Sequence, residues 1–493
     1  MVTILDCYTD EPAGLGVPPY LGTYPRYIAG YFRYLDPINH IDYITIDDLR
    51  FFKYYNLDEK KKEINHKTNI KIYNLTKNIS RIKDILDNTS LLIVILGVHT
   101  PGKYLSALPG TLKEVSDLIR DLRCEKILTG PAVFGTQLEG GKFSEKSDLS
   151  MFNKIELFDF SYDGIKEYAV KGSDITKQIP NLRIMEIETG HGCSRKKGCS
   201  FCTEPIKHSL SFRKKDDILR EIKSLYSLGC RHFRLGKQSD FYLYPDAVEL
   251  LKSIRKSFPA IDVLHIDNVN PKSVVTKKGI NLTKAVIKYC TEGNIAAFGV
   301  ESFDETLVKE NNLNCSPEET YEAVKVLNRY GSKRGNNGMP ALLPGINILF
   351  GLKGENRETH TRNMFWLNKI LKENLLLRRI NIRQVSIFEG TPLYEECGNK
   401  FLRKNRRHYW RWRNEVRQRI DLPMLRRLLP LESILRNARA DVYDGNTTFC
   451  RQVGTYPLIV GVKGRLELGK FYDFRIKGHM LRSVTGIVEG KNP

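Results

Sequence analysis

Short apolar runs alternate with stretches of helical periodicity along most of the chain. Near the start, Val2–Cys7, Leu91–Leu96 and Lys126–Leu128 are apolar runs, and Thr111–Leu122 has helical spacing. The run at Leu91–Leu96 is unbroken and rich in β-branched residues, which is typical of a parallel strand buried on both faces. Strand–helix–strand alternation predicts an open, Rossmann-like α/β sheet over residues 1–175.

The alternation restarts near residue 182 and continues for about two hundred residues. The expected strands are Ile184–Glu188, His232–Leu235, Asp262–Ile266, Ile295–Val300, Ile346–Phe350 and Ile382–Ile387. The helical stretches between them include Asp216–Leu228, Asp246–Ser257, Pro317–Tyr330 and Arg357–Leu371. Six βα units predict a partial (β/α)6 barrel over residues 176–400. Such barrels place chemistry at the carboxyl ends of their strands.

The C-terminal part of the chain has a different pattern. Thr448–Val488 contains short alternating strands broken by glycines, which predicts a small all-β barrel over residues 441–493. Residues 401–440 are expected to form a basic helical linker, with Pro423 and Pro430 near its end. This window holds twelve basic and three acidic residues, a net charge of 12 − 3 = +9.

Composition adds limits to this picture. The chain has 493 residues, of which 41% are hydrophobic and 27% charged, so disordered, collagen-like and disulfide-scaffold classes are excluded. A net charge of +21 favours polyanionic partners. No apolar run approaches the roughly 18 residues of a membrane span, and the first ten residues lack a basic region. We expect a cytoplasmic protein whose ten cysteines are ligands, reactive thiols or core residues.

Three cysteines follow the first expected barrel strand with the spacing C-x5-C-x2-C. They are Cys193, Cys199 and Cys202, close enough for one loop to wrap one metal centre. Thiolates are soft ligands that favour zinc or iron–sulfur clusters. A structural zinc site needs a fourth ligand, for which His191 and His208 are near. Three thiolates on a four-iron cluster would instead leave one iron open, and three buried cysteines without metal are the third alternative.

This loop resembles the cysteine motif of the radical S-adenosylmethionine (SAM) superfamily. That motif is C-x3-C-x2-C with an aromatic residue before the third cysteine, and Phe201 supplies the aromatic residue. The first gap here is two residues longer. Later segments resemble other elements of the family in the expected order: Leu235–Gln238, Asp267–Pro271, Phe298–Ser302, Leu349–Glu355 and Gln384–Pro392.

The resemblance implies cofactors and residues that hold them. A [4Fe–4S] cluster would be bound by the three cysteines, and the amine and carboxylate of SAM would chelate its open iron. One electron, from a donor such as ferredoxin or flavodoxin, would then release an adenosyl radical. The residues assigned to SAM are Phe201, Gly236, Lys237, Gln238, Asn268, Asn270, Glu301 and Gln384. Asn268 and Asn270 have a plain turn role as the alternative to SAM binding, and Glu301 has a salt bridge at the barrel rim as its alternative.

The N-terminal module carries a second resemblance. The segment Leu128–Thr136 resembles the "GGP" turn of cobalamin-binding domains that precede a radical SAM barrel, and ligands bind at such strand ends. The residues assigned to cobalamin are His99, Gly130 and Pro131. The D-x-H-x-x-G motif that would ligate cobalt is absent, because Asp6 and Asp10 have no suitably spaced histidine after them. Either cobalamin binds to this domain without a histidine ligand, or the domain has lost the ability to bind cobalamin.

The C-terminal part resembles a TRAM domain, an RNA-binding β-barrel. Arg451–Pro457 and Arg482–Gly486 carry this resemblance. The preceding basic segment contains Tyr409, Trp410 and Trp412, which could bind RNA by stacking while the basic residues bind phosphates. A solvated basic helix that packs its tryptophans on the barrel is the alternative.

Two functions follow from these resemblances. The first is a cobalamin-dependent C-methyltransferase acting on a macromolecule, such as a protein side chain in the manner of enzymes that modify methyl-coenzyme M reductase. The second is an RNA-modifying enzyme related to RNA methylthiotransferases, which have the same module order. Those enzymes hold a second cluster with three N-terminal cysteines, whereas residues 1–180 here contain only Cys7 and Cys124. An RNA-binding protein with a structural metal knuckle is a third class.

Overall fold

The computed structural model describes residues 1–9, 19–55, 73–97, 107–134 and 148–490. It divides into two compact units: residues 1–139, 144–187 and 213–233 form the first, and the rest of the chain forms the second. The fold is mixed α/β with parallel sheets and a closed β-barrel at the C-terminal end, which confirms the predicted fold class. Within the described ranges, no helix has the length and apolarity needed to cross a membrane.

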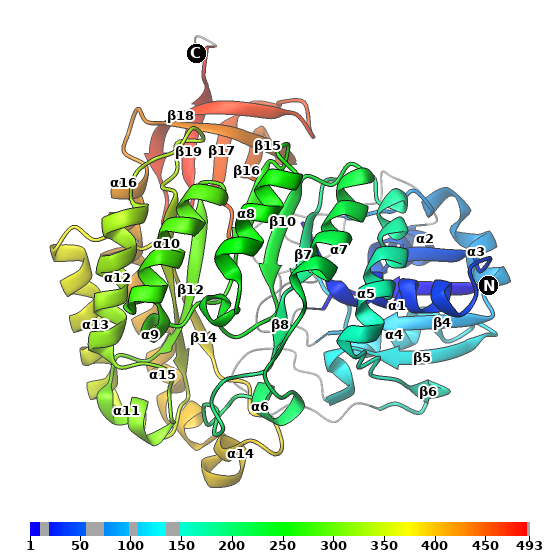
Figure 1. Ribbon diagram of the computed structural model, residues 1–493, viewed down its shortest axis with the longest axis horizontal. Helices are drawn as coiled ribbons and strands as arrows, with labels where there is room; N and C mark the ends of the chain where they lie inside the picture. Colours follow the sequence, from blue (N-terminus) through cyan, green and yellow to red (C-terminus); the bar gives the residue numbers. More distant parts are fainter. Residues whose placement is uncertain (10–18, 56–72, 98–106, 135–147, 491–493) are drawn as a thin grey trace. The chain divides into compact units, whose positions relative to one another are not determined.

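The first unit is built on a parallel five-stranded sheet of order β3-β1-β4-β5-β6 (Figure 1). Its strands are β1 (Val2–Asp6), β3 (Ile41–Thr45), β4 (Leu91–Ile95), β5 (Glu125–Thr129) and β6 (Lys154–Ile155). Every residue of β1 and β3 is buried, and four of the five in β4. Burial on both faces explains why β4 is a continuous apolar run in the sequence, whereas the equally buried β3 includes the polar residues Asp42 and Thr45.

Helices surround the sheet of the first unit. They are α1 (Thr23–Leu35), α2 (Ile46–Tyr55), η2 (Ile79–Arg81), α3 (Ile82–Asn88), α4 (Leu112–Ile119), η3 (Pro131–Phe134), α5 (Tyr162–Lys171), η4 (Gly172–Gln178) and α7 (Lys215–Ser227). One core joins Leu5, Ile44 and Val94 of the strands to Leu49 of α2 and Val115 of α4. The helix α4 begins after Thr111, whose side chain accepts a hydrogen bond from the Glu114 amide and caps the first turn.

All six strands expected for the partial barrel are present. They are β7 (Ile184–Glu188), β10 (His232–Gly236), β11 (Val263–Ile266), β12 (Asn294–Glu301), β13 (Leu342–Phe350) and β14 (Arg379–Gln384). They lie in two sheets, of order β11-β10-β7-β2 and β12-β13-β14, where β2 is Tyr20–Leu21. Two backbone hydrogen bonds join the two sheets just beyond β11. The Ala297 amide donates to the Asp267 carbonyl, and the Val269 amide donates to the Ala297 carbonyl. The strand β14 ends at Gln384, three residues before the predicted end.

Helices lie outside the strands of the second unit (Figure 1). They are α6 (Glu204–Lys207), η5 (Phe241–Leu243), α8 (Ala247–Ser257), α9 (Pro271–Val274), α10 (Lys277–Tyr289), α11 (Glu305–Glu310), α12 (Pro317–Gly331), α13 (Arg357–Lys372), α14 (Pro392–Cys397), α15 (Lys400–Val416), the π-helical turn η6 (Arg417–Asp421) and α16 (Leu422–Leu428). A short hairpin pairs β8 (Gly190–His191) with β9 (Ser211–Phe212). Ser316 and Glu319 form a capping box at the start of α12.

The C-terminal β-barrel closes in the order β15-β16-β17-β19-β18. Its strands are β15 (Ile434–Asp444), β16 (Thr447–Gln452), β17 (Ile459–Lys463), β18 (Phe471–His479) and β19 (Val484–Val488). The first strand begins inside the window expected to be a helical linker. Its buried residues are Leu435, Ala438 and Ala440, and the two arginines among them, Arg436 and Arg439, obscure the alternation in the sequence.

The loop between β16 and β17 packs into the partial barrel. The Thr455 amide donates a 3.0 Å hydrogen bond to Nδ1 of His265 on β11. The Tyr456 ring centre lies 3.7 Å from the guanidinium carbon of Arg379 on β14 and 5.5 Å from that of Arg234 on β10. The segment with the TRAM-like residues therefore contacts three strands of the barrel.

Candidate active site

The cysteine loop begins where β7 ends and is held against the end of β10. The Thr189 amide donates to the Gly236 carbonyl over 3.2 Å, and the Thr189 hydroxyl donates to Oε1 of Gln238 over 2.8 Å. Gly192 has a φ of +81°, and its amide donates to Oε1 of Glu204 over 2.8 Å. A side chain at Gly192 would meet the backbone of Ser209, so the turn requires glycine.

The three cysteines are free, half-buried thiols. Burial raises the pKa of Cys199 to about 12 and that of Cys202 to about 11. Cys202 contributes to the raised pKa of Cys199, and Cys193 to that of Cys202, so the thiols lie close enough to interact. A bound metal centre deprotonates its thiol ligands outright. A bound metal centre would supply the positive charge that stabilises these cysteines as thiolates, so the three thiols suit a metal site.

Single-ion and cluster sites differ in ligand spacing. Among the described residues, no group of three or more His, Cys, Asp or Glu side chains is arranged to hold one metal ion. Thiolates on separate irons of a four-iron cluster stand farther apart than the ligands of a single ion. The two histidines proposed for zinc stack on each other at 4.8 Å, and Nδ1 of His208 lies 3.2 Å from Glu204. Three thiols on one loop fit a [4Fe–4S] cluster.

A buried asparagine that the sequence analysis did not identify supports the loop. Asn311, after α11, is fully buried, and its Oδ1 accepts from the Ser200 hydroxyl over 2.8 Å and from the Lys353 amide over 3.1 Å. Its Nδ2 donates to the carbonyls of Lys353 and Leu307. The side chain thus links the cysteine loop to the segment after β13. No motif marks this role, because Ser200 and Lys353 lie more than forty residues away from Asn311, in opposite directions along the chain.

Arg195 and Asn312 also hold the loop. Nη1 of Arg195 lies 3.4 Å from the sulfur of Cys199, and Nη2 donates to the Asn312 carbonyl over 2.5 Å. Nδ2 of Asn312 donates to the Gly198 carbonyl over 2.9 Å. Arg195 lies in the first gap of the cysteine motif, which is two residues longer than the usual gap. The longer gap therefore places a cation beside a thiol.

Phe201 forms an apolar wall behind the loop. Its ring packs against Leu393 in one apolar cluster and against Leu307 and Leu352 in another. The Leu393 amide also donates to the Ser200 carbonyl over 2.8 Å. An aromatic side chain before the third cysteine therefore shields one side of the loop from water.

Two non-glycine residues with positive φ occupy strand ends beside this loop. Lys237 follows β10 with a φ of +72°, and Glu301 ends β12 with a φ of +62°. Such conformations are sparsely populated and concentrate at functional sites. Burial raises the pKa of Glu301 to about 8, although Arg383 opposes this shift. The carboxylate in turn contributes to the raised pKa of Cys199, so it lies near the thiols.

The remaining residues assigned to SAM divide into two groups. Gln238 is buried and its Nε2 has no hydrogen-bond partner within the described part of the chain, so a donor is available for a ligand. Nδ2 of Asn268 lies 3.4 Å from the Gln238 carbonyl, at the same edge. Asn270 instead caps α9 by accepting from the Lys272 amide, and so has a turn role. Gln384 is half-buried at the end of β14.

In the first unit, the turn after β5 is closely packed. Gly130 has a φ of +93°, and a Cβ there would lie 2.6 Å from the Leu96 carbonyl oxygen. Pro131 begins η3. The Thr129 hydroxyl is buried without a hydrogen-bond partner among the described residues and leaves a polar group at this strand end. His99, which the sequence analysis assigned to cobalamin, lies outside the described residues.

The segment after β1 has no histidine and is occupied by a hydrogen-bonded network. Tyr8 has a φ of +62°, and its hydroxyl donates to Asp47 over 2.7 Å. Asp6 accepts from the Tyr43 hydroxyl over 2.8 Å and from the Tyr8 amide over 2.9 Å. Asp6 is followed by no histidine within the described residues 1–9. Asp10 lies outside them.

Comparisons with known proteins agree with this arrangement. The radical SAM superfamily profile matches residues 187–367. The chain is 41% identical to the uncharacterized protein MJ0274 of Methanocaldococcus jannaschii, covering 98% of this chain and 92% of that protein. It is 38% identical to an uncharacterized protein of Archaeoglobus fulgidus, covering 98% and 89%.

A solved structure shares the fold across both units. It is the radical SAM methyltransferase TsrM of Kitasatospora setae with tryptophan and a SAM analogue bound. The TM-score is 0.51 at 13% identity, covering 80% of this chain and 74% of TsrM. With the thiol loop, the strand ends and the family profile in agreement, residues 187–367 of the chain form a domain of the radical SAM superfamily, whose enzymes use a [4Fe–4S] cluster and SAM.

Proposed function

We propose that the protein is a cobalamin-dependent radical SAM C-methyltransferase that acts on an unactivated carbon of a macromolecule. The observation that carries this proposal is the likeness of fold to TsrM over 80% of the chain. TsrM is a radical SAM methyltransferase. A protein side chain or an RNA base can each supply the carbon, and the reducing cytoplasm is the expected location.

The residues of the second unit have separate tasks in this proposal. Cys193, Cys199 and Cys202 hold the cluster, while Asn311 keeps their loop in place. The free Nε2 of Gln238 binds SAM, and Phe201 excludes water from one side of the loop. When bound, the cluster supplies the electron that breaks the sulfonium bond of SAM. The cysteine loop determines where that bond breaks, because it sets the position of the open iron.

Cobalamin is proposed to bind at the carboxyl edge of the first unit's sheet. Thr129, Gly130 and Pro131 form the turn there, and the unpartnered Thr129 hydroxyl is available to a polar ligand group. When bound, cobalamin supplies a carrier for the methyl group. The Tyr8 hydroxyl is engaged by Asp47, so the proposal includes no cobalt ligand from the segment after β1.

The products define the reaction. One SAM loses its methyl group and becomes S-adenosylhomocysteine. A second SAM is split into methionine and 5′-deoxyadenosine, which takes up the hydrogen removed from the substrate. The methyl group takes the place of that hydrogen, and two electrons from a donor such as ferredoxin or flavodoxin balance the exchange. Sulfur insertion is disfavoured, because Cys7 is buried in the core and leaves Cys124 without a partner for a second cluster.

The decisive experiment is anaerobic reconstitution with iron, sulfide and cobalamin. We expect about four irons per chain, retention of cobalamin after gel filtration, and 5′-deoxyadenosine when SAM and a reductant are added. Replacing Cys193, Cys199 and Cys202 with Ala should abolish iron binding and 5′-deoxyadenosine. The matched control is Cys397→Ala, a half-buried thiol of α14 whose loss should leave both unchanged.

Each result separates one part of the proposal. Zinc without iron–sulfur absorption would contradict the cluster assignment. Normal iron content and 5′-deoxyadenosine without retained cobalamin would remove the methyl carrier and leave a different radical SAM reaction. S-adenosylhomocysteine formed only when cobalamin is present would support methyl transfer.

A further inference from the structure

The helix α15 has two distinct faces. Its inner face is buried and consists of Leu402, Asn405, Tyr409, Trp412 and Val416. Its exposed residues form what we name the α15 basic face, which consists of Lys400, Arg403, Lys404, Arg406, Arg407, Trp410 and Arg411. These positions recur with spacings of three and four, so neighbours along the face lie about 5–6 Å apart.

Packing on the partial barrel determines which residues face water. The Trp412 ring centre lies 4.5 Å from that of Phe350 at the end of β13 and 5.5 Å from that of His360 on α13. Tyr409 packs on Phe350 at 5.1 Å. Two of the three aromatic residues noted in the sequence are therefore core residues. Trp410 is the exception, with 58% of its side chain exposed.

The charge of the basic face is not neutralised within the described part of the chain. Arg403, Lys404, Arg406 and Arg407 form no ion pair there, and Lys400–Asn414 contains no acidic residue. The first carboxylate of the helix, Glu415, is engaged by Arg419. An uncompensated cluster of this kind attracts polyanions.

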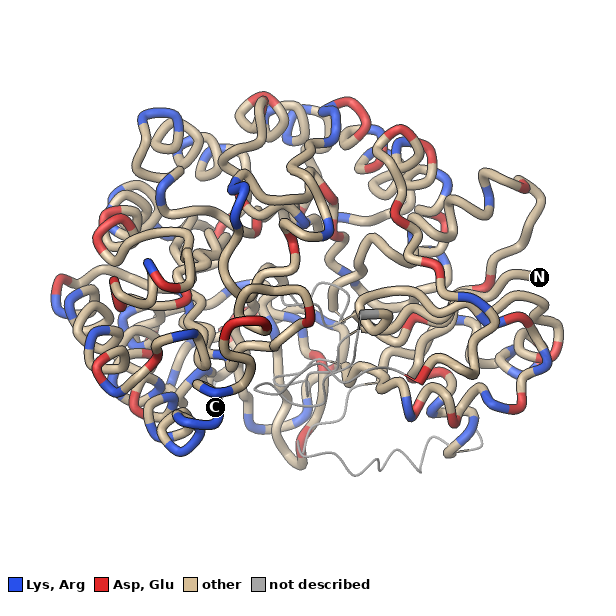
Figure 2. Tube along the Cα trace, turned by 90° about the horizontal axis from the view of Figure 1, so that it is seen from below, with Lys and Arg blue, Asp and Glu red and all other residues tan. Residues whose placement is uncertain are grey.

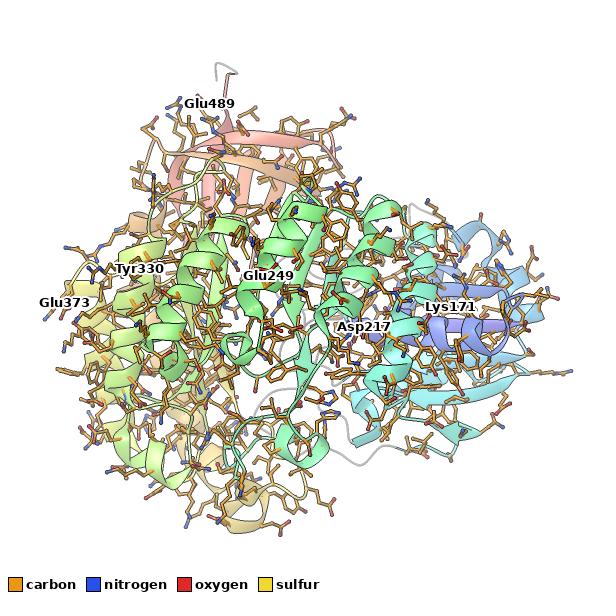
Figure 3. The ribbon with its side chains drawn as sticks, in the orientation of Figure 1. Lys171, Asp217, Glu249, Tyr330, Glu373 and Glu489 are labelled. Atoms are coloured by element: carbon orange, nitrogen blue, oxygen red, sulfur yellow. The ribbon has the colours of Figure 1, made fainter. Side chains whose placement is uncertain are left out.

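Other helices of the second unit carry both acidic and basic side chains. Figure 2 shows Lys and Arg beside Asp and Glu over most of the trace. On α8, Glu249 pairs with Lys252, and at the end of α13 Glu373 accepts from Tyr321 (Figure 3). An excess of one sign on α15 is thus a local property of this helix.

Trp410 distinguishes among polyanions. The guanidinium carbon of Arg413 lies 5.3 Å from its ring centre. Exposed aromatic rings among arginines are stacking platforms for the bases of single-stranded nucleic acids. An acidic protein would need only the charges, whereas the exposed ring among the arginines also offers a face on which a base can stack.

The segment expected to bind RNA is unavailable for that role. Thr455 and Gly454 are buried, and Tyr456 lies beside Arg379 of the barrel. These residues of the motif that resembles a TRAM domain are thus packed inside the second unit. The charge that suggested nucleic acid lies instead on α15.

We infer that the α15 basic face docks single-stranded RNA, with its phosphates on the arginines and lysines and a base stacked on Trp410. The inference concerns binding, and it adds a partner to the proposed reaction without resting on it. The test therefore measures affinity alone, and its failure leaves the methyltransferase proposal untouched.

The test uses the iron-loaded full chain and a fluorescein-labelled oligouridylate of about 20 nucleotides, with affinity measured by anisotropy over a series of KCl concentrations. The variant Arg403→Gln/Lys404→Gln/Arg407→Gln removes three cations of the face. Its matched control is Lys309→Gln/Arg329→Gln/Arg357→Gln, which removes two arginines and one lysine exposed on α11, α12 and α13. Trp410→Ala removes the ring.

We expect the first variant to weaken binding at least tenfold and to lower the salt slope by about two, since each lost phosphate contact contributes about 0.7. The control should change affinity less than twofold. Trp410→Ala should weaken binding at least fivefold with the salt slope unchanged. Equal losses in the first variant and its control would overturn the inference. So would labelled polyglutamate that binds as tightly as the RNA with no effect of Trp410→Ala, a result expected for an acidic protein partner.

Discussion

Two buried carboxyl groups of the first unit, those of Asp6 and Asp48, make its stability fall as the pH rises. Burial raises the pKa of Asp6 from 3.8 to about 6, although the hydrogen bonds from Tyr43 and Tyr8 lower it. Burial likewise raises the pKa of Asp48 to about 6. Between pH 4 and 6 the folded state therefore binds more protons than the unfolded chain. The stability that these two groups contribute is fully present at low pH, and it is lost as the pH rises through their folded-state pKa of about 6.

Replacing Asp6 with Asn should remove part of this dependence. Asn keeps the acceptor for the Tyr8 amide and has no charge to bury. For wild type, the shift at Asp6 corresponds to about 3 kcal/mol lost between pH 4 and 7. We expect Asp6→Asn to protect the β1 amides from hydrogen exchange more than wild type at pH 7, but not at pH 4. The exposed Asp84→Asn is the control, and the same pH dependence in both variants would contradict the assignment.

A second residue-scale prediction concerns Asn311. Asn311→Ala leaves the Ser200 hydroxyl and the Lys353 amide without their partner, at a cost of about 1–3 kcal/mol for each buried group. The cysteine loop should loosen, and an iron chelator should remove iron at least tenfold faster than from wild type. Asn328→Ala is the matched control, because that buried asparagine bonds to Leu376 on both atoms of its amide and does not touch the loop. Equal release rates would show that Asn311 does not hold the loop.

At the scale of elements, the β16–β17 loop links the C-terminal barrel to the partial barrel. Its Gly454 permits a close approach, because a Cβ there would lie 2.8 Å from Cε1 of His265. The Tyr456 carbonyl accepts from Arg378 over 2.5 Å, while the ring covers Arg379. One loop therefore contacts strands that are far apart in the chain.

Tyr456→Ala should destabilise the second unit by about 2–4 kcal/mol, because it removes a large ring and its contacts with two arginines. Tyr456→Phe keeps the ring and should cost much less. Thermal unfolding followed by tryptophan fluorescence measures this unit, since all three tryptophans, Trp366, Trp410 and Trp412, belong to it. An unchanged midpoint for Tyr456→Ala would mean that the loop rests on the barrel without stabilising it.

At the scale of the whole molecule, the C-terminal barrel shares a core with the radical SAM unit. Met339 and Leu343 of the partial barrel belong to the same apolar cluster as Leu428 of α16 and Leu435 and Phe474 of the β-barrel. The β-barrel is thus part of the second unit, although its sequence pattern suggests a separate domain.

A chain that ends at Glu432 should therefore fail to fold its catalytic unit. The truncation uncovers the apolar cluster shared with the β-barrel and removes the contacts of Tyr456. We expect little folded, iron-binding protein compared with the full chain expressed in parallel. A truncated chain with normal iron content and normal thermal unfolding would show that the two parts fold independently.

Most elements were predictable because their signals are local. Burial on both faces makes β1 and β4 recognisable as apolar runs, and helical periodicity located α7, α8, α12 and α13 within one residue at each end. The strand β15 was missed because its arginines break the alternation of buried residues. The end of β14 was placed too late, because the apolar run continues beyond the last residue paired with β13.

The candidate site divides in the same way. The three cysteines and Phe201 lie within one short loop, so their spacing alone indicated a metal centre. Asn311, Asn312 and Arg195 gave no such signal, because what matters is their contact with the loop, and two of them are over a hundred residues away from it.

The sequence by itself determined the order of the modules, the six strands of the partial barrel, the strands β1, β4 and β5 of the first unit, and the cysteine loop, because hydrophobic period and ligand spacing are properties of neighbouring residues. Only the tertiary structure decided which polar residues are buried and which face of a segment meets water. It placed Tyr456 against the barrel, Trp412 in the core and Trp410 outside. The reason is physical: burial depends on what packs against a residue, and the packing partners come from distant parts of the chain.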